Sequence, residues 1–295
     1  CEGGFMTLHK AKGKLYIELP LSSLDREMLI ASTVSDCSAA DVATIGYKEE
    51  APLHVKFQKV DSTILLTMVN VLPDFDKDDP AMRKAVEVSK VDPVLSSWSM
   101  TCWNPDSTAV VFDATSMFVG DNKDLALVKS GSAGGGLSVT ANFNKDGSYL
   151  KEIKAFTDNV TIKSVMSYKL KATVLGLLTL YSDKPFTGTA TRTIMLLPEE
   201  KMRPRIADSR LGLFLTDRTD MYTGQDAMKD YSVIRRWNLQ PSDMEAWQSG
   251  ELVEPVKPVV FYIDDALPEL WREPAKRGVL RWNKAFEQLW IILGN

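Results

Sequence analysis

The sequence has little histidine, little cysteine and no surplus of positive charge. Its 295 residues include two histidines and three cysteines, and its formal net charge is -4. Without a surplus of lysine and arginine there is no general basic field for a phosphate backbone, so nucleic acid is not expected as a partner. The remaining composition, 44% hydrophobic and 25% charged, is that of an ordinary globular protein.

The three cysteines, Cys1, Cys37 and Cys102, lie far apart and form no CxxC pair. This spacing argues against a thiol-ligated zinc site or a redox motif. Cys37 and Cys102 remain candidates for a disulfide, which spacing alone does not decide. Cys1 has two interpretations. It is either the lipid-carrying first residue of a mature bacterial lipoprotein, which would add a lipid anchor, or simply a boundary of the sequence.

Long hydrophobic runs and metal-binding motifs are also absent. No apolar run approaches the roughly 20 residues of a transmembrane helix, and no signal-peptide pattern is seen. The longest run, Val174–Leu180, is short and contains Gly176, which favours one buried strand. His9 and His54 lie far apart and neither is followed by glutamate, so neither begins an HExxH zinc motif. We therefore expect no cofactor in this chain.

The first two thirds of the chain show the period-two alternation of β-strands. Many strands, few helical stretches and no strand–helix alternation favour an α+β fold with a mainly antiparallel, β-rich body. Residues 76–92 are the exception and predict a short helix beginning near Pro80. Residues 129–136, KSGSAGGG, predict a flexible loop, and not a phosphate-binding loop, because no lysine follows the glycines. Strands are predicted at Lys14–Leu19, Met28–Val34, His54–Lys59, Thr63–Val69, Thr108–Phe112, Asn159–Tyr168, Lys171–Ser182 and Ala190–Leu197, with a hairpin turn at Asp61–Ser62.

The last forty residues change character. The apolar run after Pro258 predicts a buried strand over 258–263. Pro274 fits the first position of a helix over 273–289. An apolar stripe at spacings of 4, 3, 4 and 3 predicts that this helix is amphipathic, and its members are Ala275, Val279, Trp282, Phe286 and Leu289. Such a strand and helix need partners, so either they pack on the β-rich body or the rest of their domain is missing.

Residues 256–289, VKPVVFYIDDALPELWREPAKRGVLRWNKAFEQL, resemble the opening of a metzincin-type peptidase domain. In that clan a first buried strand precedes a long helix with a Trp-Asn-x-Ala-Phe segment. The matching positions are Val259–Ile263, followed by Trp282, Asn283, Ala285 and Phe286. The resemblance implies that residues 258–289 open a catalytic domain.

Upstream segments are similar to the module that precedes the catalytic domain in a family of large bacterial zinc-dependent peptidases. In that family the zinc motif, HExxHxxGxxH, lies further downstream and is absent here. The resemblance therefore implies a non-catalytic accessory, docking or propiece-like region with zinc only in a downstream domain. The segments are Lys12–Pro20, Asn104–Thr115, Ile194–Phe214, Ile234–Asp243 and Gly250–Asp264.

This resemblance sets the expected organisation, partners and location. Residues 1–72 are predicted to be an N-terminal β-rich segment, residues 73–253 a β-rich accessory module, and residues 254–295 the start of a truncated peptidase-like domain. The expected partner is the chain's own downstream peptidase domain, together with a protein or peptide substrate. The expected location is periplasmic, outer-membrane-associated or secreted, in a bacterium.

The densest polar cluster comprises Arg203, Arg205, Asp208 and Arg210. One interpretation is a latency device, in which Asp208 reaches the zinc of the downstream domain. The other is an arginine–aspartate network that docks the module on that domain, since arginine pairs with carboxylates in a bidentate manner. Three aromatic side chains, Trp271, Trp282 and Phe286, are candidates for interdomain packing.

A second function class stays open, a stand-alone cell-surface or periplasmic module that binds peptides or glycans. Arg235, Arg236 and Trp237 are candidates for such a surface, although a strand with alternating exposure is the simpler explanation for them. Exposed apolar surface on the terminal strand and helix would favour the accessory region. A concave, aromatic-lined groove in the β-rich body would favour the binding module.

Overall fold

The computed structural model describes residues 1–47, 51–71, 73–76, 78–128, 130–132, 136–222 and 228–289. Its contacts divide the chain into two compact units, unit 1 (Cys1–Lys201) and unit 2 (from Met202 onward). Strand makes up 46% of the structure and helix 14%, so the chain is a mainly antiparallel β protein with few helices. No helix in the described ranges combines the length and apolarity needed to cross a membrane.

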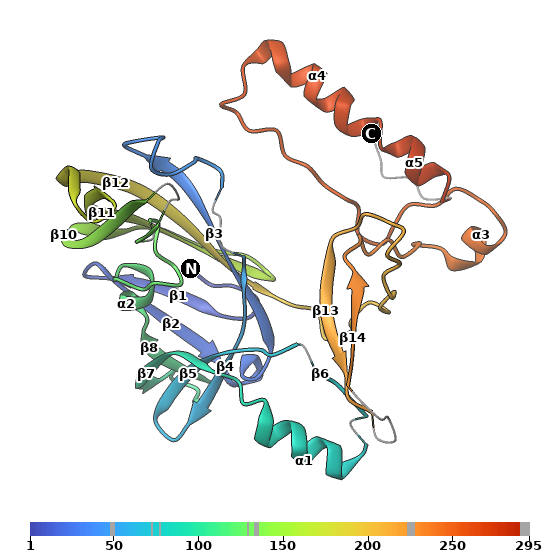
Figure 1. The fold of residues 1–295 in the computed structure, drawn as a ribbon. Coiled ribbons are helices and arrows are strands. Elements are labelled where there is room, and N and C mark those ends of the chain that lie inside the picture. The colour runs from blue at the N-terminus through green and yellow to red at the C-terminus, as the bar shows by residue number, and fades with distance from the viewer. Residues whose placement is uncertain are drawn as a thin grey trace. The chain divides into compact units, whose positions relative to one another are not determined.

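Unit 1 is built on one antiparallel sheet that curls into a half-barrel (Figure 1). Eleven strands of the described residues form it, in the order β1-β2-β8-β7-β5-β4-β3-β12-β11-β10-β9. The strands of unit 1 are β1 (Thr7–Ala11), β2 (Lys14–Pro20), β3 (Glu27–Cys37), β4 (Leu53–Val60), β5 (Thr63–Met68), β6 (Pro73–Asp74), β7 (Val94–Trp103), β8 (Ala109–Asp113), β9 (Gly131–Ser132), β10 (Leu137–Ala155), β11 (Asn159–Val174) and β12 (Leu178–Leu196). Its helices are η1 (Leu21–Ser23), α1 (Pro80–Ser89) and α2 (Thr115–Phe118).

Local chemistry explains several of these elements. Asp61, with a positive φ of 50°, turns the chain between β4 and β5, which confirms the predicted hairpin. The predicted helix near Pro80 is α1. The Asp79 carboxylate accepts hydrogen bonds from the backbone N–H groups of Ala81 and Met82, at 2.9 and 3.1 Å. This cap satisfies donors that the first helical turn leaves free, while Pro80 occupies a position that needs no N–H.

The predicted buried strand Val174–Leu180 is wrong, because it contains a turn. Leu175 and Gly176 both have positive φ, of 52° and 68°, and Leu177 N–H donates to the Val174 carbonyl at 3.0 Å. Leu175 is 71% exposed and Leu177 91% exposed. The turn joins β11 to β12, each longer than predicted, so that Lys171–Ser182 spans both strands instead of forming one. Two positive φ values in succession are typical of tight hairpin turns whose twist matches the sheet.

The core of unit 1 is centred on an aromatic cluster. Phe57, Trp98 and Phe112 lie with ring centroids 5.1 to 6.2 Å apart and are 8% exposed or less. A second buried cluster is formed by Met166 and Tyr168 of β11 and Phe186 of β12, together with Val34 of β3 and Leu127. The alternating strands of the sequence thus bury one face, as period-two patterns predict.

Unit 2 contains a hairpin and three short helices with almost no core. It comprises β13 (Leu215–Asp220), β14 (Lys229–Ile234), α3 (Met244–Gln248), α4 (Glu269–Leu280) and α5 (Asn283–Glu287). Among the described hydrophobic residues of unit 2, Val253 alone is buried, with 7% of its surface exposed. The hairpin and helices are therefore hydrogen-bonded locally but not packed around an interior of their own.

Two predictions for the C-terminal segment are corrected by the structure. Residues 258–263 form no strand, because no neighbouring strand among the described residues offers them hydrogen-bond partners. The helix begins at Glu269, with Pro268 as its N-cap and Pro274 inside it, and it is interrupted before α5. Trp271 N–H donates to the Pro268 carbonyl at 2.9 Å, which closes a first turn ahead of Pro274.

The boundary between the compact units lies between Lys201 and Met202. It coincides with neither of the predicted domain boundaries, which were placed at 72/73 and 253/254. On either side of residue 72, β5 and β7 pair in the same sheet. Backbone pairing thus continues across the first predicted boundary.

Candidate functional site

Of the predicted polar cluster, the structure joins Asp208 and Arg210. Arg210 Nε donates to both carboxylate oxygens of Asp208, at 2.9 and 3.2 Å, and its backbone N–H donates to Oδ1 at 3.0 Å. The guanidinium lowers the pKa of Asp208 below its ordinary value. The Arg210 side chain is 87% exposed, so this pair lies at the surface.

Arg203 and Arg205 take part through their backbones instead. The Arg203 carbonyl accepts a hydrogen bond from Arg236 Nη2 at 2.7 Å, and the Arg205 carbonyl accepts one from Ile234 N–H at 3.0 Å. These contacts tie the segment to the end of β14. Arg235 and Arg236 lie just beyond that strand, not within one as expected. The cluster is therefore two separate features. One is the exposed ion pair, and the other is a segment whose backbone carbonyls are hydrogen-bonded to residues at the end of β14.

The three predicted packing residues are all accessible. Trp271 is 56% exposed, Trp282 is 68% exposed and Phe286 is half-buried. Trp282 and Phe286 line a groove of about 850 Å³ with residues of the 258–263 segment, whereas Trp271 does not. The structure thus brings together two of the three.

This apolar groove lies within unit 2. Its walls are Val260, Phe261 and Ile263 on one side and the helical residues around Val279 and Trp282 on the other. Trp237, itself 56% exposed, packs edge-on against Phe261 with ring centroids 6.4 Å apart. Apolar surface gathered in this way is uncommon on a soluble monomer and typically marks an interaction site.

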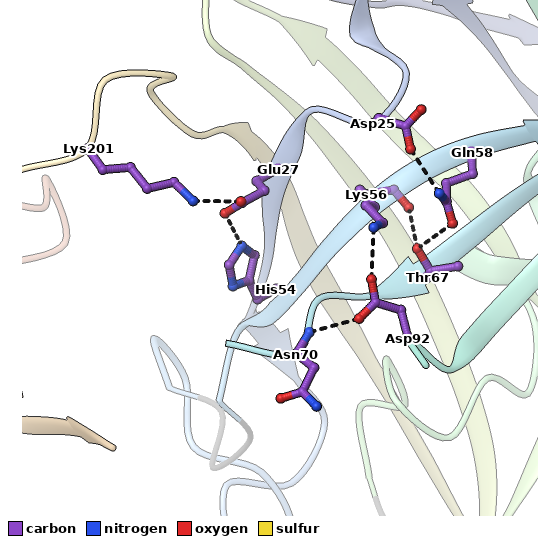
Figure 2. A network of polar contacts seen from close by, with 9 residues as sticks. All are labelled: Asp25, Glu27, His54, Lys56, Gln58, Thr67, Asn70, Asp92 and Lys201. Carbon is purple, nitrogen blue, oxygen red and sulfur yellow. Dashed lines mark hydrogen bonds and ion pairs between the residues drawn. The ribbon is translucent and has the colours of Figure 1, made fainter. Parts of the chain in front are cut away.

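A polar network covers the outer face of β3, β4 and β5 (Figure 2). Glu27 is its centre: one carboxylate oxygen lies 2.6 Å from Lys201 Nζ and the other 2.9 Å from His54 Nε2. Partial burial opposes the charge on Glu27, but Lys201 and His54 outweigh it and lower the pKa of Glu27. Next to it, Arg26 pairs with Glu199 at 2.8 Å, and Leu197 N–H donates to the Glu27 carbonyl at 2.9 Å.

These contacts fasten the chain where it leaves the sheet of unit 1, since Lys201 is the last residue of that unit. The same face carries an ion pair between Lys56 and Asp92 at 2.8 Å (Figure 2). Glu27 and His54 form a carboxylate–imidazole pair, but their contacts are with Lys201 and β-strand neighbours. We assign the network a structural role, holding the end of unit 1 against β3.

The remaining histidine pairs with a glutamate, and the three cysteines are free thiols. His9 Nε2 lies 2.8 Å from Glu18 on the adjacent strand. Cys37 and Cys102 are both free thiols, so the candidate disulfide is not formed. Cys1 is exposed, and its ammonium donates to the Leu8 carbonyl at 2.8 Å. Within the described residues, no group of three or more His, Cys, Asp or Glu side chains is arranged to hold a metal ion.

A cleft of about 790 Å³ lies in unit 1, and sequence reasoning missed it. Its described lining comes from residues 40–44 with Tyr47, from residues 126–128 and 130–132, and from Tyr181 on β12. Residues 129 and 133–135 of the predicted KSGSAGGG loop lie outside the described residues, and Gly131–Ser132 forms the short strand β9. Tyr47 is 57% exposed, and Lys184 Nζ lies 5.3 Å from the Tyr181 ring centroid.

Arg192 is a second feature that sequence reasoning missed. It is 1% exposed on β12, and its guanidinium donates to the carbonyls of Phe118 at 3.0 Å and Leu125 at 2.6 Å. Burial lowers its pKa to about 10, which keeps it charged at neutral pH. It has no carboxylate among its hydrogen-bond partners, and its Nε and the hydroxyls of Ser32 and Ser164 have no hydrogen-bond partner in the described part of the chain. A lone arginine in an alternating strand gives no sequence signal of burial.

Comparisons with known families match nearly the whole of unit 1 and part of unit 2. The family model DUF5118, described as a domain of unknown function, matches residues 2–37, and DUF5117, described in the same words, matches residues 48–242. Neither description names a peptidase, so the metzincin resemblance rests on the sequence segments alone. No curated protein and no solved structure matches the chain.

The two family matches meet within one sheet. The DUF5118 match ends at Cys37, the last residue of β3, and β3 lies between β4 and β12, both inside the DUF5117 match. Strands of one sheet share their backbone hydrogen bonds, so the DUF5118 match and the part of the DUF5117 match that lies in unit 1 form one structural unit. With about two thirds of its residues matched by that model, the chain belongs to the DUF5117 family.

Proposed function

We propose that the chain is the non-catalytic N-terminal region of a secreted or cell-surface zinc metallopeptidase, and that residues 254–289 open its catalytic domain. Unit 1 then serves as the folded accessory module, and unit 2 carries the surface that docks on the rest of the peptidase. The zinc and its ligands belong to the downstream domain. The observation that carries the proposal is the exposed apolar groove around Phe261 and Trp282.

The amount of apolar surface left open in unit 2 supports a docking role. Val260, Phe261 and Trp282 are 59%, 62% and 68% exposed, although all three belong to the segment that resembles the start of a metzincin domain. Burying one such side chain contributes roughly 1.5–3 kcal/mol. A domain that covered this groove would therefore gain several such contributions at once.

The composition of residues 258–263 also supports docking on the downstream domain. This run follows Pro258 and is apolar at every position up to Ile263, which is typical of a strand covered on both faces. A strand forms only where a neighbour supplies hydrogen-bond partners. We propose that the downstream peptidase domain supplies both the neighbouring strand and the apolar cover.

The test compares this chain with a longer one that extends through the expected HExxHxxGxxH motif. Zinc is measured by elemental analysis and activity by casein cleavage. We expect the present chain to be metal-free and inert, and the longer chain to hold one zinc and cleave casein. In the longer chain the amides of residues 258–263 should exchange more slowly than in the present one, because they become paired.

Matched variants separate docking from a general effect on folding. In the longer chain, Trp282→Ala should reduce casein cleavage and the protection of residues 258–263, whereas Trp103→Ala, a 41% exposed tryptophan of unit 1, should change neither. Stoichiometric zinc or casein cleavage by the present chain alone would refute the proposal. Equal exchange of residues 258–263 in the two chains would refute the docking role.

The second candidate is a stand-alone cell-surface or periplasmic module that binds peptides or glycans. The cleft of unit 1, with Tyr47 and Tyr181 at its rim, specifically favours it. Clefts of several hundred Å³ with a few convergent polar groups are the usual shape of ligand sites. The two candidates involve different units of the chain and are tested separately.

A further inference from the structure

We propose that the turn between β11 and β12 inserts into the surface of a lipid membrane that contains anionic lipids. The inserted part is the leucine tip, which we define as Leu175, Leu177, Leu178 and Leu180. The proposal goes beyond both candidate functions and depends on neither. It concerns leucines of unit 1 that line neither the groove of unit 2 nor, among the described residues, the cleft of unit 1.

The leucine tip gathers exposed apolar side chains at one place. Leu177 is 91% exposed, and Leu175, Leu178 and Leu180 are 71%, 61% and 54% exposed. All four lie between residues 175 and 180, where the long β11–β12 hairpin turns (Figure 1). Single exposed leucines are ordinary on a protein surface, whereas a continuous apolar group marks a site of protein or membrane interaction.

The backbone at Leu175 shows that folding alone does not favour a leucine there. Leu175 has a φ of 52°, in the left-handed region that glycine, asparagine and aspartate adopt at lower cost. The leucine also buries little of its side chain in return. A contact outside the chain therefore accounts for the leucine better than the turn itself does.

The tip is ordered by its own hydrogen bonds. Leu177 N–H donates to the Val174 carbonyl at 3.0 Å, and Leu175 N–H donates to the Gly136 carbonyl at 2.8 Å. Directly behind the turn, Val174 pairs with Leu178 on one side and with Leu137 on the other. A backbone donor without a partner is costly in an apolar medium, so these bonds lower the cost of moving the turn into the membrane.

Two lysines on β11 lie at a suitable distance behind the tip. Lys169 and Lys171 are both exposed, and Lys171 precedes Leu175 by four residues. At about 3.3 Å per residue, roughly 13 Å separates these two positions along the strand. Apolar side chains of peripheral proteins reach about 5–10 Å into the boundary between headgroups and acyl chains. Lys171 would then lie near the headgroups, where anionic lipids attract it.

The charge of the whole hairpin supports the same choice of lipid. From Ser167 to Lys184 it contains three lysines and one aspartate, Asp183, whereas the complete chain has a net charge of -4. Lys184 forms an ion pair with Asp41 at 3.7 Å, so Lys169 and Lys171 are the lysines on which the proposal rests. This part of an acidic protein is thus locally positive, which favours an anionic surface.

A membrane suits the leucine tip better than another protein does. Stable protein interfaces use about 20–30 residues a side, including partners formed by a second copy of the same chain. Four leucines at one turn provide far less than that. Insertion at a membrane surface requires only apolar side chains that reach the acyl boundary and basic side chains behind them.

The test is sedimentation of the present chain with sucrose-loaded vesicles. One set contains phosphatidylcholine with about one third phosphatidylglycerol, and the other contains phosphatidylcholine alone. We expect the chain to bind the mixed vesicles with an apparent Kd within about tenfold of the roughly 0.1 mM that a single myristoyl chain gives. Binding to phosphatidylcholine alone should be about tenfold weaker, because the two lysines then find no anionic headgroup.

Variants locate the binding at the tip. Leu175→Asn and Leu177→Asn should each raise the apparent Kd about tenfold, because a leucine that leaves water contributes strongly to insertion. Leu175→Asn should not lower the thermal midpoint, since asparagine tolerates a positive φ better than leucine does. This variant therefore separates loss of membrane binding from misfolding.

A control and a charge variant complete the set. Val91→Asn makes the same kind of change at a 75% exposed valine just beyond α1 and should alter the Kd by less than about twofold. Combining Lys169→Gln with Lys171→Gln should weaken binding to the mixed vesicles and leave binding to phosphatidylcholine unchanged.

Several outcomes would overturn the proposal. These are failure to sediment with the mixed vesicles, binding that Leu175→Asn and Leu177→Asn leave unchanged, and an equal loss in Val91→Asn. Self-association that Leu177→Asn abolishes, without vesicle binding, would assign the tip to a second copy of the chain instead. Equal binding to both vesicle types would overturn the assignment to anionic lipid.

Discussion

The two units of this chain differ in where they put their apolar side chains. All the buried hydrophobic residues of the described chain except Val253 belong to unit 1. In unit 2 the apolar residues of the hairpin, the extended segment and the helices are mostly at the surface, as Phe214, Phe261 and Leu270 illustrate at 83%, 62% and 78% exposed. One chain thus contains a region that completes its own core and another that does not.

The contrast shows that regular backbone hydrogen bonding does not by itself produce a buried core. In unit 2, β13 and β14 pair over six residues each and α3 has an Asp243 cap, yet none of this creates an interior. Most of the stability of helices and hairpins in proteins comes from packing an apolar face, not from local bonds. The structure of unit 2 is therefore expected to depend on what covers it.

The largest expected effect on stability comes from deleting a buried aromatic ring of unit 1, and the matched deletion of an exposed ring in unit 2 should have little effect. Phe112→Ala removes the centre of the buried aromatic cluster and should destabilise the chain by about 4 kcal/mol. Phe261→Ala removes a 62% exposed ring and should change the free energy of unfolding by less than about 0.5 kcal/mol. Urea denaturation followed by circular dichroism measures both. Similar losses would mean that unit 2 has a core of its own.

The next effect concerns the buried Arg192. Arg192→Ala leaves a cavity and frees the carbonyls of Phe118 and Leu125, so we expect a loss of about 3 kcal/mol. Arg192→Met fills much of the same volume without a charge and should cost less, because burying a charge is itself expensive. Chemical denaturation of the two variants ranks them. A loss for methionine as large as that for alanine would show that the guanidinium and its hydrogen bonds, and not the filled volume, provide the stability.

A smaller, pH-dependent effect is expected at the end of unit 1. Glu27→Gln removes the carboxylate that Lys201 and His54 share, and should cost about 1 kcal/mol at pH 7. Because the folded pKa of Glu27 lies below its ordinary 4.5, this contribution is present above that pH and is lost as the pH falls through the folded value. The difference between wild type and variant should therefore shrink below about pH 4.5. A difference independent of pH would contradict the ion-pair assignment.

The smallest effect is expected from the ion pair of Asp208 and Arg210. Both side chains lie at the surface, and exposed pairs of this kind contribute little to stability. Asp208→Asn should leave the thermal midpoint of the present chain unchanged. In the longer chain the same change tests latency, since loss of a carboxylate that blocks zinc would raise the initial rate of casein cleavage. No change in that rate would leave docking as the interpretation of this cluster.

The sequence predicted the local parts of the fold well, because their signals are local. Alternation identified β2 and β4, and Pro80 after an acidic residue identified α1. The half-barrel and its strand order were not predictable, since β3 pairs with β12 far along the chain and no pattern in a single sequence specifies such partners. Leu175 and Leu177 misled the strand prediction, because a hairpin tip that exposes leucines looks the same as a buried strand.

The candidate sites were predicted less well than the fold. Trp282 and Phe286 do share a groove, which the helical spacing of the stripe anticipated. The described lining of the cleft in unit 1 includes residues 40–44, 47, 126–128, 130–132 and 181, whose proximity depends on the sheet order and not on any motif. The predicted strand at 258–263 failed for a related reason, because apolar composition shows that a segment needs partners but not whether they are present.

The pairing of β3 with β12 has a consequence for the order in which the chain assembles during synthesis. Ser35 and Thr191 bond across this pair although they lie 156 positions apart. At roughly 5–20 residues per second, a ribosome takes about 8 to 30 s to make the intervening chain. Until then β3 can pair with β4 on one side only, and its other edge stays open to pairing with other chains. The interval before β12 is made is therefore one in which a nascent chain is open to aggregation and would benefit from a chaperone.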